Sequence, residues 1–224
     1  MKISFVIPTL NEGKNMSRIL SELITESKKR KLNYEIIVVD GYSNDKTVEI
    51  AKKYNVKIIY DGIGKGSALR RGIKEAKGDI VITIDADCSH RTSEIGFLIE
   101  GIKSGYDICM GSRFIQGGGT EDMPYYRKLG NKFFVFLVNF LYNTSYSDLC
   151  YGYRSIKRGC INKLGLKSDG FGIETEISIK AAKKGLKTLE IPSFEKIRKE
   201  GEGKLKTFKD GFEILKIILK SLVK

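Results

Sequence analysis

The sequence of 224 residues is poor in several features that would each point to a particular class of protein. A structural zinc site or a Ser-His-Asp triad would have to be built around one histidine, His90. The four cysteines show no CxxC spacing, which is typical of free thiols in a reducing compartment. Three prolines and no Ser/Gly-rich linker favour one domain over two. No apolar run reaches the roughly 18 residues of a spanning helix, so we expect none.

What the sequence has in excess is positive charge. The formal net charge is +13, and the apolar fraction of 41% is ordinary for a globular protein. Such a charge favours anionic partners, namely nucleic acid, a membrane surface or phosphate-rich ligands. Zinc-finger spacing, an RNP-like aromatic motif and a clear helix-turn-helix are all absent, so we expect no nucleic-acid partner.

Apolar runs alternate with amphipathic segments along most of the chain. This alternation predicts an α/β fold with one doubly wound, mostly parallel sheet and flanking helices. Strands are expected at residues 3–8, 34–40, 56–60, 80–84, 106–111 and 186–191, with a short last strand at 194–198. Helices are expected at residues 15–29, 47–54, 92–103 and 125–142. Two further helices are expected to end near residues 76 and 184. The glycine-rich loop at 116–123 is expected to be mobile.

Two carboxylates, Asp85 and Asp87, directly follow a buried apolar strand. Ligands bind beyond the carboxyl ends of the strands in such sheets. Carboxylates at i and i+2 can share a hard divalent cation, although an Asx turn after the strand would look the same. Asp40 and Arg113 end two other strands at the same edge, which favours a binding site over a turn.

Two segments combine apolar and basic residues. Residues 133–142 are nearly all apolar and follow Arg127, Lys128 and Lys132, which fits either a core helix or a helix in a membrane interface. Residues 205–224 form a basic amphipathic helix suited to an anionic membrane surface or to a partner. We therefore divide the chain into a domain at 1–204 and this C-terminal helix at 205–224. One apolar face of the helix is formed by Leu205, Phe208, Phe212, Leu215, Ile218, Leu219 and Leu222.

Eight short blocks occur in an order that resembles the family 2 glycosyltransferases of the GT-A fold. The narrower resemblance is to the polyprenol-phosphate (dolichol-phosphate) mannosyl- and glucosyltransferases. The blocks are Val6-Ile-Pro-Thr-Leu-Asn-Glu12, Val38-Val-Asp-Gly-Tyr-Ser-Asn-Asp-Lys-Thr47, Gly64-Lys-Gly-Ser-Ala68, Gly78-Asp79 with Asp85-Ala-Asp-Cys-Ser-His90, Gly111-Ser-Arg-Phe114, Ser147-Asp148 with Gly152-Tyr-Arg154, Glu174-Thr-Glu176, and Arg198 with Gly201-Glu-Gly-Lys-Leu205.

The resemblance implies an inverting enzyme that moves mannose or glucose from GDP-mannose or UDP-glucose to polyprenyl (dolichyl) phosphate. Mg²⁺ or Mn²⁺ would be held by Asp85 and Asp87, with Ser89 as a further ligand and Ala86 lining the donor site. Asp87 and Arg113 would be catalytic. The enzyme would be cytoplasmic and peripheral on the cytoplasmic face of the membrane.

The remaining implied roles concern the two substrates. Asp40 would accept a hydrogen bond from the base, Arg113 would contact a phosphate, and Arg198 and Lys204 would neutralise the leaving diphosphate. Arg127 and Asn131 would bind the lipid phosphate. The nucleoside would be held by Pro8, Leu10, Glu12, Val38 and Asp40.

Two alternatives stay open at this point. A phosphate acceptor is ionised near pH 7 and needs no strong base, whereas a hydroxyl acceptor would need one, and Asp148 is the candidate. The chain could also be a non-catalytic module that binds nucleotides or anionic lipid. Three residues depart from the family pattern: Leu10, Gly41 and Gly203. Leu10 removes an aromatic residue from the donor pocket, which leaves the donor open between GDP-mannose and UDP-glucose.

Overall fold

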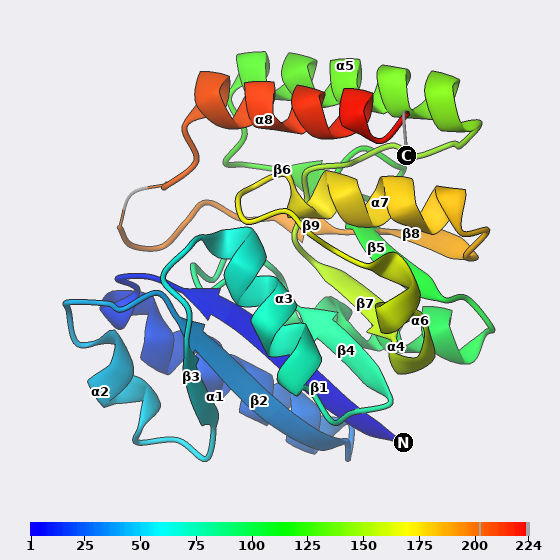
Figure 1. The fold of residues 1–224 in the computed structure, drawn as a ribbon. Coiled ribbons are helices and arrows are strands. Elements are labelled where there is room, and N and C mark those ends of the chain that lie inside the picture. Colours follow the sequence, from blue (N-terminus) through cyan, green and yellow to red (C-terminus); the bar gives the residue numbers. More distant parts are fainter. Residues whose placement is uncertain (202, 223–224) are drawn as a thin grey trace.

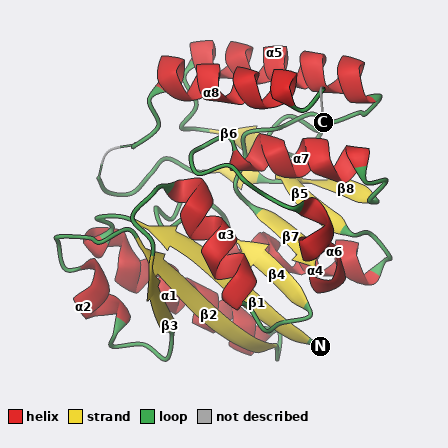
Figure 2. Ribbon diagram, viewed as in Figure 1, coloured by secondary structure: helices red, strands yellow, loops and turns green. Residues whose placement is uncertain are grey.

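The computed structural model describes residues 1–201 and 203–222 of the chain. Within them, seven strands form one sheet in the order β3-β2-β1-β4-β7-β5-β8, and helices cover both of its faces (Figures 1 and 2). The strands of this sheet are β1 (Lys2–Thr9), β2 (Asn33–Asp40), β3 (Lys57–Tyr60), β4 (Ile80–Thr83), β5 (Ile108–Ser112), β7 (Arg154–Lys157) and β8 (Thr188–Pro192). The helices are α1 (Gly13–Lys29), α2 (Thr47–Ala51), α3 (Lys65–Glu75), the 3-10 turn η1 (Thr92–Glu94), α4 (Ile95–Lys103), α5 (Tyr125–Tyr142), α6 (Arg158–Leu164), α7 (Ile173–Lys183) and α8 (Thr207–Lys220).

The sheet is parallel except at β7, which runs antiparallel to both β4 and β5. The other strand pairs are parallel, so the predicted α/β fold with a mostly parallel sheet is confirmed. Because β5 opposes β7 and β7 opposes β4, the carboxyl ends of β1, β2, β4 and β5 all meet at one edge. That edge is where the sequence placed its candidate site.

Each face of the sheet carries its own apolar core. Strand side chains alternate between the two faces, so Phe5 packs into the core beneath α1 and α4 while Val6 packs into the core beneath α3 and α7. The second core also includes Ile214 and Ile218 of α8. Both faces of the central strands are therefore buried, as expected for a doubly wound sheet.

Three local features differ from the sequence expectation. Helix α6 follows β7 directly, in a segment for which no helix was predicted. The glycine-rich loop at 116–123, which was expected to be mobile, contains a strand, β6 (Gly119–Thr120), that pairs with β9 (Phe194–Glu195). Thr120 Oγ1 also donates to Glu195 Oε2 over 2.6 Å. The last strand, expected at 194–198, is correspondingly limited to β9.

Helices α5 and α8 lie side by side in the outermost layer, beyond α7 (Figure 1). Tyr142 Oη of α5 donates to the carbonyl of Ile218 in α8 over 3.0 Å. The apolar face predicted for the C-terminal helix is divided: Ile218 is buried, whereas Phe208 and Phe212 are exposed. None of the described helices has the length and apolar character needed to cross a bilayer. Residues 223–224 of the predicted C-terminal segment lie outside the described residues.

Candidate active site

The candidate site lies at the edge where β1 and β4 end. Helix α1 follows β1 through a short loop that contains Glu12, and the loop after β4 carries Asp85 and Asp87. Two hydrogen bonds hold this second loop: Ile84 N–H donates to the carbonyl of Val6 over 3.1 Å, and Asp85 N–H donates to the side-chain Nδ1 of His90 over 3.2 Å. The imidazole is buried and stacks on Tyr153 with ring centroids 4.9 Å apart. The buried, stacked imidazole of His90 thus helps to fix the backbone that carries the carboxylate pair.

Asp85 is held by a buried lysine at the start of α3. Lys65 Nζ lies 2.9 Å from Asp85 Oδ1 and 2.9 Å from Glu174 Oε1, at the start of α7. Burial alone would lower the pKa of Lys65, but the two carboxylates outweigh it and raise that pKa above its ordinary value. Burial would raise the pKa of Asp85, and Lys65 reverses the effect and lowers it. Both groups are therefore charged at neutral pH.

Asp87 is held by an arginine from the far end of the chain. Arg198 Nη2 lies 2.8 Å from Asp87 Oδ2, and Arg198 Nη1 lies 3.0 Å from Glu12 Oε1. Lys204 Nζ reaches the same Glu12 oxygen over 3.1 Å. Burial opposes the charge on Arg198, yet Asp87 and Glu12 raise its pKa. Ser89 Oγ donates to Asp87 Oδ1 over 2.7 Å. The structure thus brings these five predicted site residues together.

A cavity of about 460 Å³ opens beside this cluster. Its walls come from the loop after β1 and from the segment that precedes α8. It is lined by Asn11, Glu12, Gly201, Gly203, Lys204 and Lys206. The two lysines in its wall could pair with the phosphate groups of a ligand in this cavity. Glu202, part of the block that ends at Leu205, lies outside the described residues.

The carboxylate pair fits a divalent cation that keeps open positions. Asp85 and Asp87 offer hard oxygen ligands, and in this structure Lys65 and Arg198 supply positive charge at those same oxygens. Within the described part of the chain, no group of three or more His, Cys, Asp or Glu side chains could hold a metal. A cation bound here would draw its remaining ligands from water and from phosphate oxygens, as Mg²⁺ commonly does.

The predicted nucleoside contacts are placed unevenly. Leu10 is 40% exposed beside the site, whereas Asp40 and Val38 have no exposed surface. Asp40 Oδ1 accepts from Ser43 Oγ over 2.6 Å, and Val38 belongs to the core under α1. Pro8 is half-buried in β1, and Ala86 is buried in the same core as Val38. A contact between a nucleotide base and the side chain of Asp40 or Val38 would require the sheet edge to open locally. Both contacts stay predictions.

Arg113 occupies a buried ion-pair network. Its Nε lies 2.7 Å from Asp148 Oδ2 and its Nη1 lies 3.0 Å from Glu195 Oε1. Its Nη2 donates to Asp148 Oδ1 over 2.9 Å, and the guanidinium stacks over Tyr151. All three guanidinium nitrogens therefore take part in ion pairs. A contact between Arg113 and a phosphate would require one of these pairs to break. That contact stays a prediction. Asp148 is fully buried in this pair, an arrangement that favours a structural role over that of a base.

The predicted acceptor residues lie on α5, close to the segment that lines the cavity. Arg127 Nε donates to Thr207 Oγ1 over 3.0 Å, and its Nη2 donates to the carbonyl of Leu205 over 3.2 Å. Asn131 is buried, and its Oδ1 accepts from Leu149 N–H over 3.2 Å. Among the described residues, 1–201 and 203–222, its Nδ2 has no hydrogen-bond partner. A buried amide donor without a partner is costly, which is consistent with a ligand that supplies an acceptor there.

Sequence reasoning gave no role to Lys65, Glu174 or Asp122. Lys65 lies in a glycine-rich block whose simplest interpretation is a flexible turn, and its partner Glu174 is 109 positions away in the sequence. Asp122 follows β6, where burial, Glu195 and Asp87 together raise its pKa. The sequence feature that could have identified Lys65 and Glu174 is the resemblance of the Gly64–Ala68 and Glu174–Glu176 blocks to the family. That resemblance does not indicate which residues they contact.

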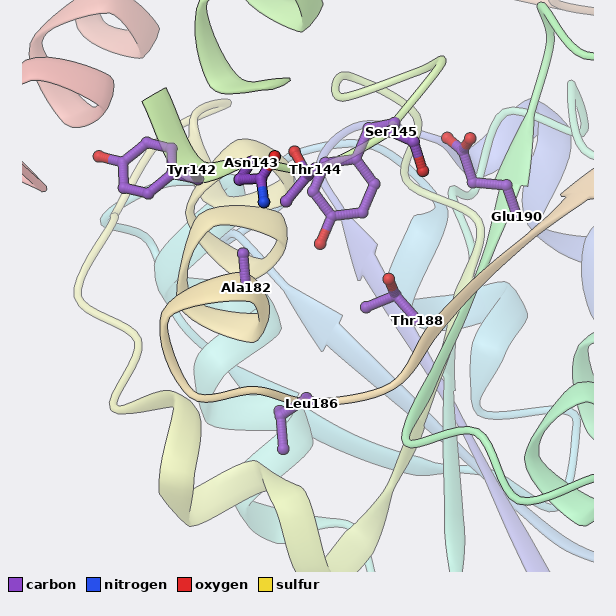
Figure 3. A pocket seen from close by; sticks show the side chains of 9 residues that line it. Tyr142, Asn143, Thr144, Ser145, Ala182, Leu186, Thr188 and Glu190 are labelled. Atoms are coloured by element: carbon purple, nitrogen blue, oxygen red, sulfur yellow. The ribbon is translucent and has the colours of Figure 1, made fainter. Parts of the chain in front are cut away.

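A second pocket, of about 300 Å³, lies away from the carboxylate pair, between the ends of α5 and α7 and strand β8 (Figure 3). Its acidic residue, Glu190, accepts hydrogen bonds from Ser147 N–H, Ser147 Oγ and Asp148 N–H. Burial raises the pKa of Glu190. These bonds anchor the backbone that carries Asp148, so the glutamate supports the Arg113 network rather than a ligand.

A mostly parallel sheet covered by helices on both faces, with an acidic pair after its central strand, is typical of the GT-A class of fold. A crystal structure of glucosyl-3-phosphoglycerate synthase from Mycobacterium tuberculosis with Mn²⁺, UDP-glucose and phosphoglyceric acid matches at a TM-score of 0.78 and 18% identity. The match covers 99% of this chain and 80% of that one. At this identity the likeness establishes the fold alone.

The sequence comparisons then give the family. The family described as Glycosyl transferase family 2 matches residues 4–165, and the chain belongs to that family. The chain is 39% identical to a dolichol-phosphate mannosyltransferase of Pyrococcus furiosus, over 97% of this chain and 63% of that protein. It is 28% identical to glycosyltransferase AglJ of Haloferax volcanii, over 93% of this chain and 68% of that protein. This chain thus spans 63% of the length of the Pyrococcus relative.

Proposed function

We propose that this chain is a metal-dependent, inverting glycosyltransferase that moves a hexose from a nucleotide-diphosphate sugar to polyprenyl phosphate. The observation that carries the proposal is the cluster of Asp85, Asp87, Arg198 and Lys204 beside a cavity of about 460 Å³. The name of the Pyrococcus relative supports mannose and dolichyl phosphate. The UDP-glucose bound in the Mycobacterium neighbour supports UDP-glucose as the second donor to test.

The proposed chemistry separates charge at the anomeric carbon. As the C–O bond breaks, negative charge develops on the departing diphosphate. A divalent cation, when bound at Asp85 and Asp87, would stabilise that charge. Arg198 and Lys204 now pair with Glu12, and they would turn the same positive charge toward the diphosphate. Both cations already lie at the site, so binding of the diphosphate requires them to exchange Glu12 for phosphate oxygens.

A phosphate acceptor suits the site better than a hydroxyl acceptor. A lipid phosphate is ionised at neutral pH and attacks without help from a base, on the face opposite the leaving group. The product anomer would be inverted. The base candidate for a hydroxyl acceptor, Asp148, is buried and accepts two hydrogen bonds from the guanidinium of Arg113. On α5, Arg127 and the unpartnered Nδ2 of Asn131 are the groups we assign to the acceptor phosphate.

The location we propose is peripheral, on the cytoplasmic face of a membrane. A polyprenyl chain is embedded in lipid, so the enzyme must bring its site to the membrane surface. α5 carries Arg127 and Asn131, and it also carries an exposed row of aromatic residues. α8 contributes exposed phenylalanines and lysines next to it. Such a combination of aromatic and basic residues is typical of helices that lie in a membrane interface.

The test is a transfer assay with the purified chain. GDP-mannose and UDP-glucose are each incubated with dolichyl phosphate and with Mg²⁺ or Mn²⁺, and lipid-linked sugar is measured. We expect product with one donor and none in the presence of EDTA. Asp87→Asn should lower the rate roughly a hundredfold or more, because the leaving charge is then poorly stabilised. Glu100→Gln, an exposed change on α4, is the control and should leave the rate unchanged.

Three results would contradict the proposal. One is the absence of product with every donor and metal. Another is unchanged turnover in Asp87→Asn. The third is nucleotide binding that does not depend on metal and survives Asp85→Ala, which would instead support a non-catalytic binding module.

A further inference from the structure

The residue that carries this inference is Glu174, which is not among the described residues that line the cavity of about 460 Å³ and which pairs with Lys65. Glu174 is buried at the first turn of α7. Its Oε1 lies 2.9 Å from Lys65 Nζ. The same ammonium lies 2.9 Å from Asp85 Oδ1 and 3.1 Å from Asp85 Oδ2. One cation is therefore shared between two carboxylates, and one of those carboxylates belongs to the proposed metal pair.

The backbone holds Lys65 in this position from two sides. Gly66 N–H donates to Asp169 O over 2.8 Å, and a Cβ at Gly66 would lie 2.5 Å from the carbonyl oxygen of Ser168. A Cβ at Gly152 would lie 3.0 Å from Asp85 Oδ2 and 3.2 Å from Lys65 Nζ. Glycine at these two positions lets the backbone approach closely enough to confine the ammonium. Lys65 is thus a built part of the site and not a surface lysine that happens to reach an acid.

The charge count explains why Glu174 is needed. If Lys65 paired with Asp85 alone, the pair would be neutral, and a divalent cation would have to compete with a buried ammonium for the same oxygens. With Glu174 present, the three side chains sum to one negative charge. Asp85 can then stay close to Lys65 and still offer electron pairs to a metal.

We propose that Glu174 is a positioning residue that shares the ammonium of Lys65 with Asp85, so that Asp85 keeps the negative charge it needs to bind a divalent cation. The inference rests on the proposed metal and diphosphate site. It assigns to the helix start a task in metal binding and no direct part in the transfer of the sugar. Outer partners of metal ligands commonly change metal affinity by roughly ten- to a hundredfold when removed.

The test measures metal binding and not turnover. Mn²⁺ is titrated into the whole chain by calorimetry in the presence of saturating GDP, and in parallel UDP. We expect Glu174→Gln to weaken Mn²⁺ binding roughly tenfold, because Lys65 then neutralises Asp85 alone. The double variant Lys65→Met/Glu174→Gln removes both charges of the pair and should restore most of the lost affinity. A merely structural role for Glu174 would not give that recovery.

The matched control is Glu26→Gln on α1. Glu26 is also a buried glutamate in an ion pair, 2.6 Å from Arg30 Nε, but it lies on the opposite face of the sheet. The Glu26→Gln variant should have lower thermal stability, and its Mn²⁺ affinity should stay within about twofold of the wild type. The same outcome in Glu174→Gln, or no recovery in the double variant, would overturn the positioning role alone. A wild-type chain that binds neither Mn²⁺ nor nucleotide would overturn the proposed function, and the positioning role with it.

Discussion

Single residues in this molecule show two uses of a carboxylate that is paired with a cation. Asp85 and Asp87 stay partly exposed, and each is met by a cation that a ligand could replace. Asp148 has no exposed surface and meets Arg113 through two parallel contacts, of 2.7 and 2.9 Å. Two-point contacts of this kind fix geometry strongly. Hence we assign the first pair to ligand binding and the second carboxylate to the architecture of the site.

This assignment predicts the effect of Asp148→Asn. Removing the charge leaves Arg113 buried with Glu195 as its one remaining anionic partner. We expect the free energy of unfolding to fall by about 3 kcal/mol, the usual cost of breaking a buried ion pair from one side. Urea denaturation measures the change. The double variant Arg113→Met/Asp148→Leu should recover much of the loss, since no buried charge is then left uncompensated.

An exposed ion pair supplies the control for that experiment. Glu75→Gln breaks the contact with Lys57 at the surface, where such pairs contribute at most about 1 kcal/mol. If Asp148→Asn were as mild as Glu75→Gln, the ion pair would not be structural. If it kept full stability but lost transfer, the role of base would return as the better interpretation.

The residues of the site differ in how well a sequence reveals them. Asp85 and Asp87 could be found because a strand pattern ends on them and the carboxyl ends of parallel strands share an edge. Lys65 could not, because its partners come from segments 20 and 109 positions away and its own block looks like a turn. The engagement of Arg113 by Asp148 and Glu195 depends on how three loops pack, which periodicity does not encode.

At the scale of elements, long periodic segments were the predictable ones. Helix α5 spans Tyr125–Tyr142 as expected, because an unbroken segment of eighteen residues is too long for a strand. The direction of β7 was not predictable, since a four-residue strand carries no signal for parallel or antiparallel pairing. Helix α6 has only seven residues and no strong amphipathic pattern. Tertiary packing decides such short elements.

Three elements are joined by a single side chain, that of Glu35 in β2. Its carboxylate accepts from Lys2 Nζ over 2.8 Å and from Ser4 Oγ over 2.5 Å, both in β1. It also accepts from Lys77 N–H, between α3 and β4, over 2.6 Å. Burial would raise the pKa of Glu35, but these donors lower it from 4.5 to about 2. An ionised carboxylate therefore connects β2 with β1 and with the segment between α3 and β4.

The lowered pKa of Glu35 predicts a pH dependence of stability. The folded pKa lies below the unfolded one, so the stabilisation is present above about pH 4.5 and is lost as the pH falls toward 2. Glu35→Gln should lower the free energy of unfolding by about 1 to 2 kcal/mol at pH 7, with allowance for solvent screening. The difference from wild type should shrink between about pH 4.5 and 2, as measured by urea denaturation at several pH values. Glu49→Gln, at an exposed pair on α2, should show neither effect.

At the scale of the whole molecule, charge and exposed apolar surface gather on the layer formed by α5 and α8. Five aromatic side chains are exposed on α5, and all fall on one side of the helix. They are Tyr125, Tyr126, Phe133, Phe136 and Phe140. α8 adds Phe208, which is 92% exposed, and Phe212. α5 contains no acidic residue, and the acidic residues of α8, Asp210 and Glu213, are buried or half-buried. The exposed charges of both helices are therefore positive, which suits an anionic lipid surface.

We expect the whole chain to bind vesicles that contain an anionic lipid, as measured by co-sedimentation. Binding should weaken with added salt and should be weaker on vesicles of zwitterionic lipid alone. The double variant Phe136→Ser/Phe140→Ser should bind about tenfold more weakly, because two rings no longer enter the interface. These two positions make no contact with the carboxylate pair, so Mn²⁺ and nucleotide affinity should stay at the wild-type value.

The strength of that test lies in its control. Phe97 on α4 is 59% exposed, comparable to Phe136, but it lies in a different part of the molecule from the α5–α8 layer (Figure 1). Phe97→Ser removes the same kind of exposed ring and should leave vesicle binding unchanged. Equal losses in both variants would mean that general hydrophobicity drives sedimentation, and no loss in either would mean that this layer is not the membrane-binding face. A loss confined to the α5 variant would identify the α5–α8 layer as the face that binds the membrane, because rings on that layer would contribute to binding while an equally exposed ring elsewhere would not.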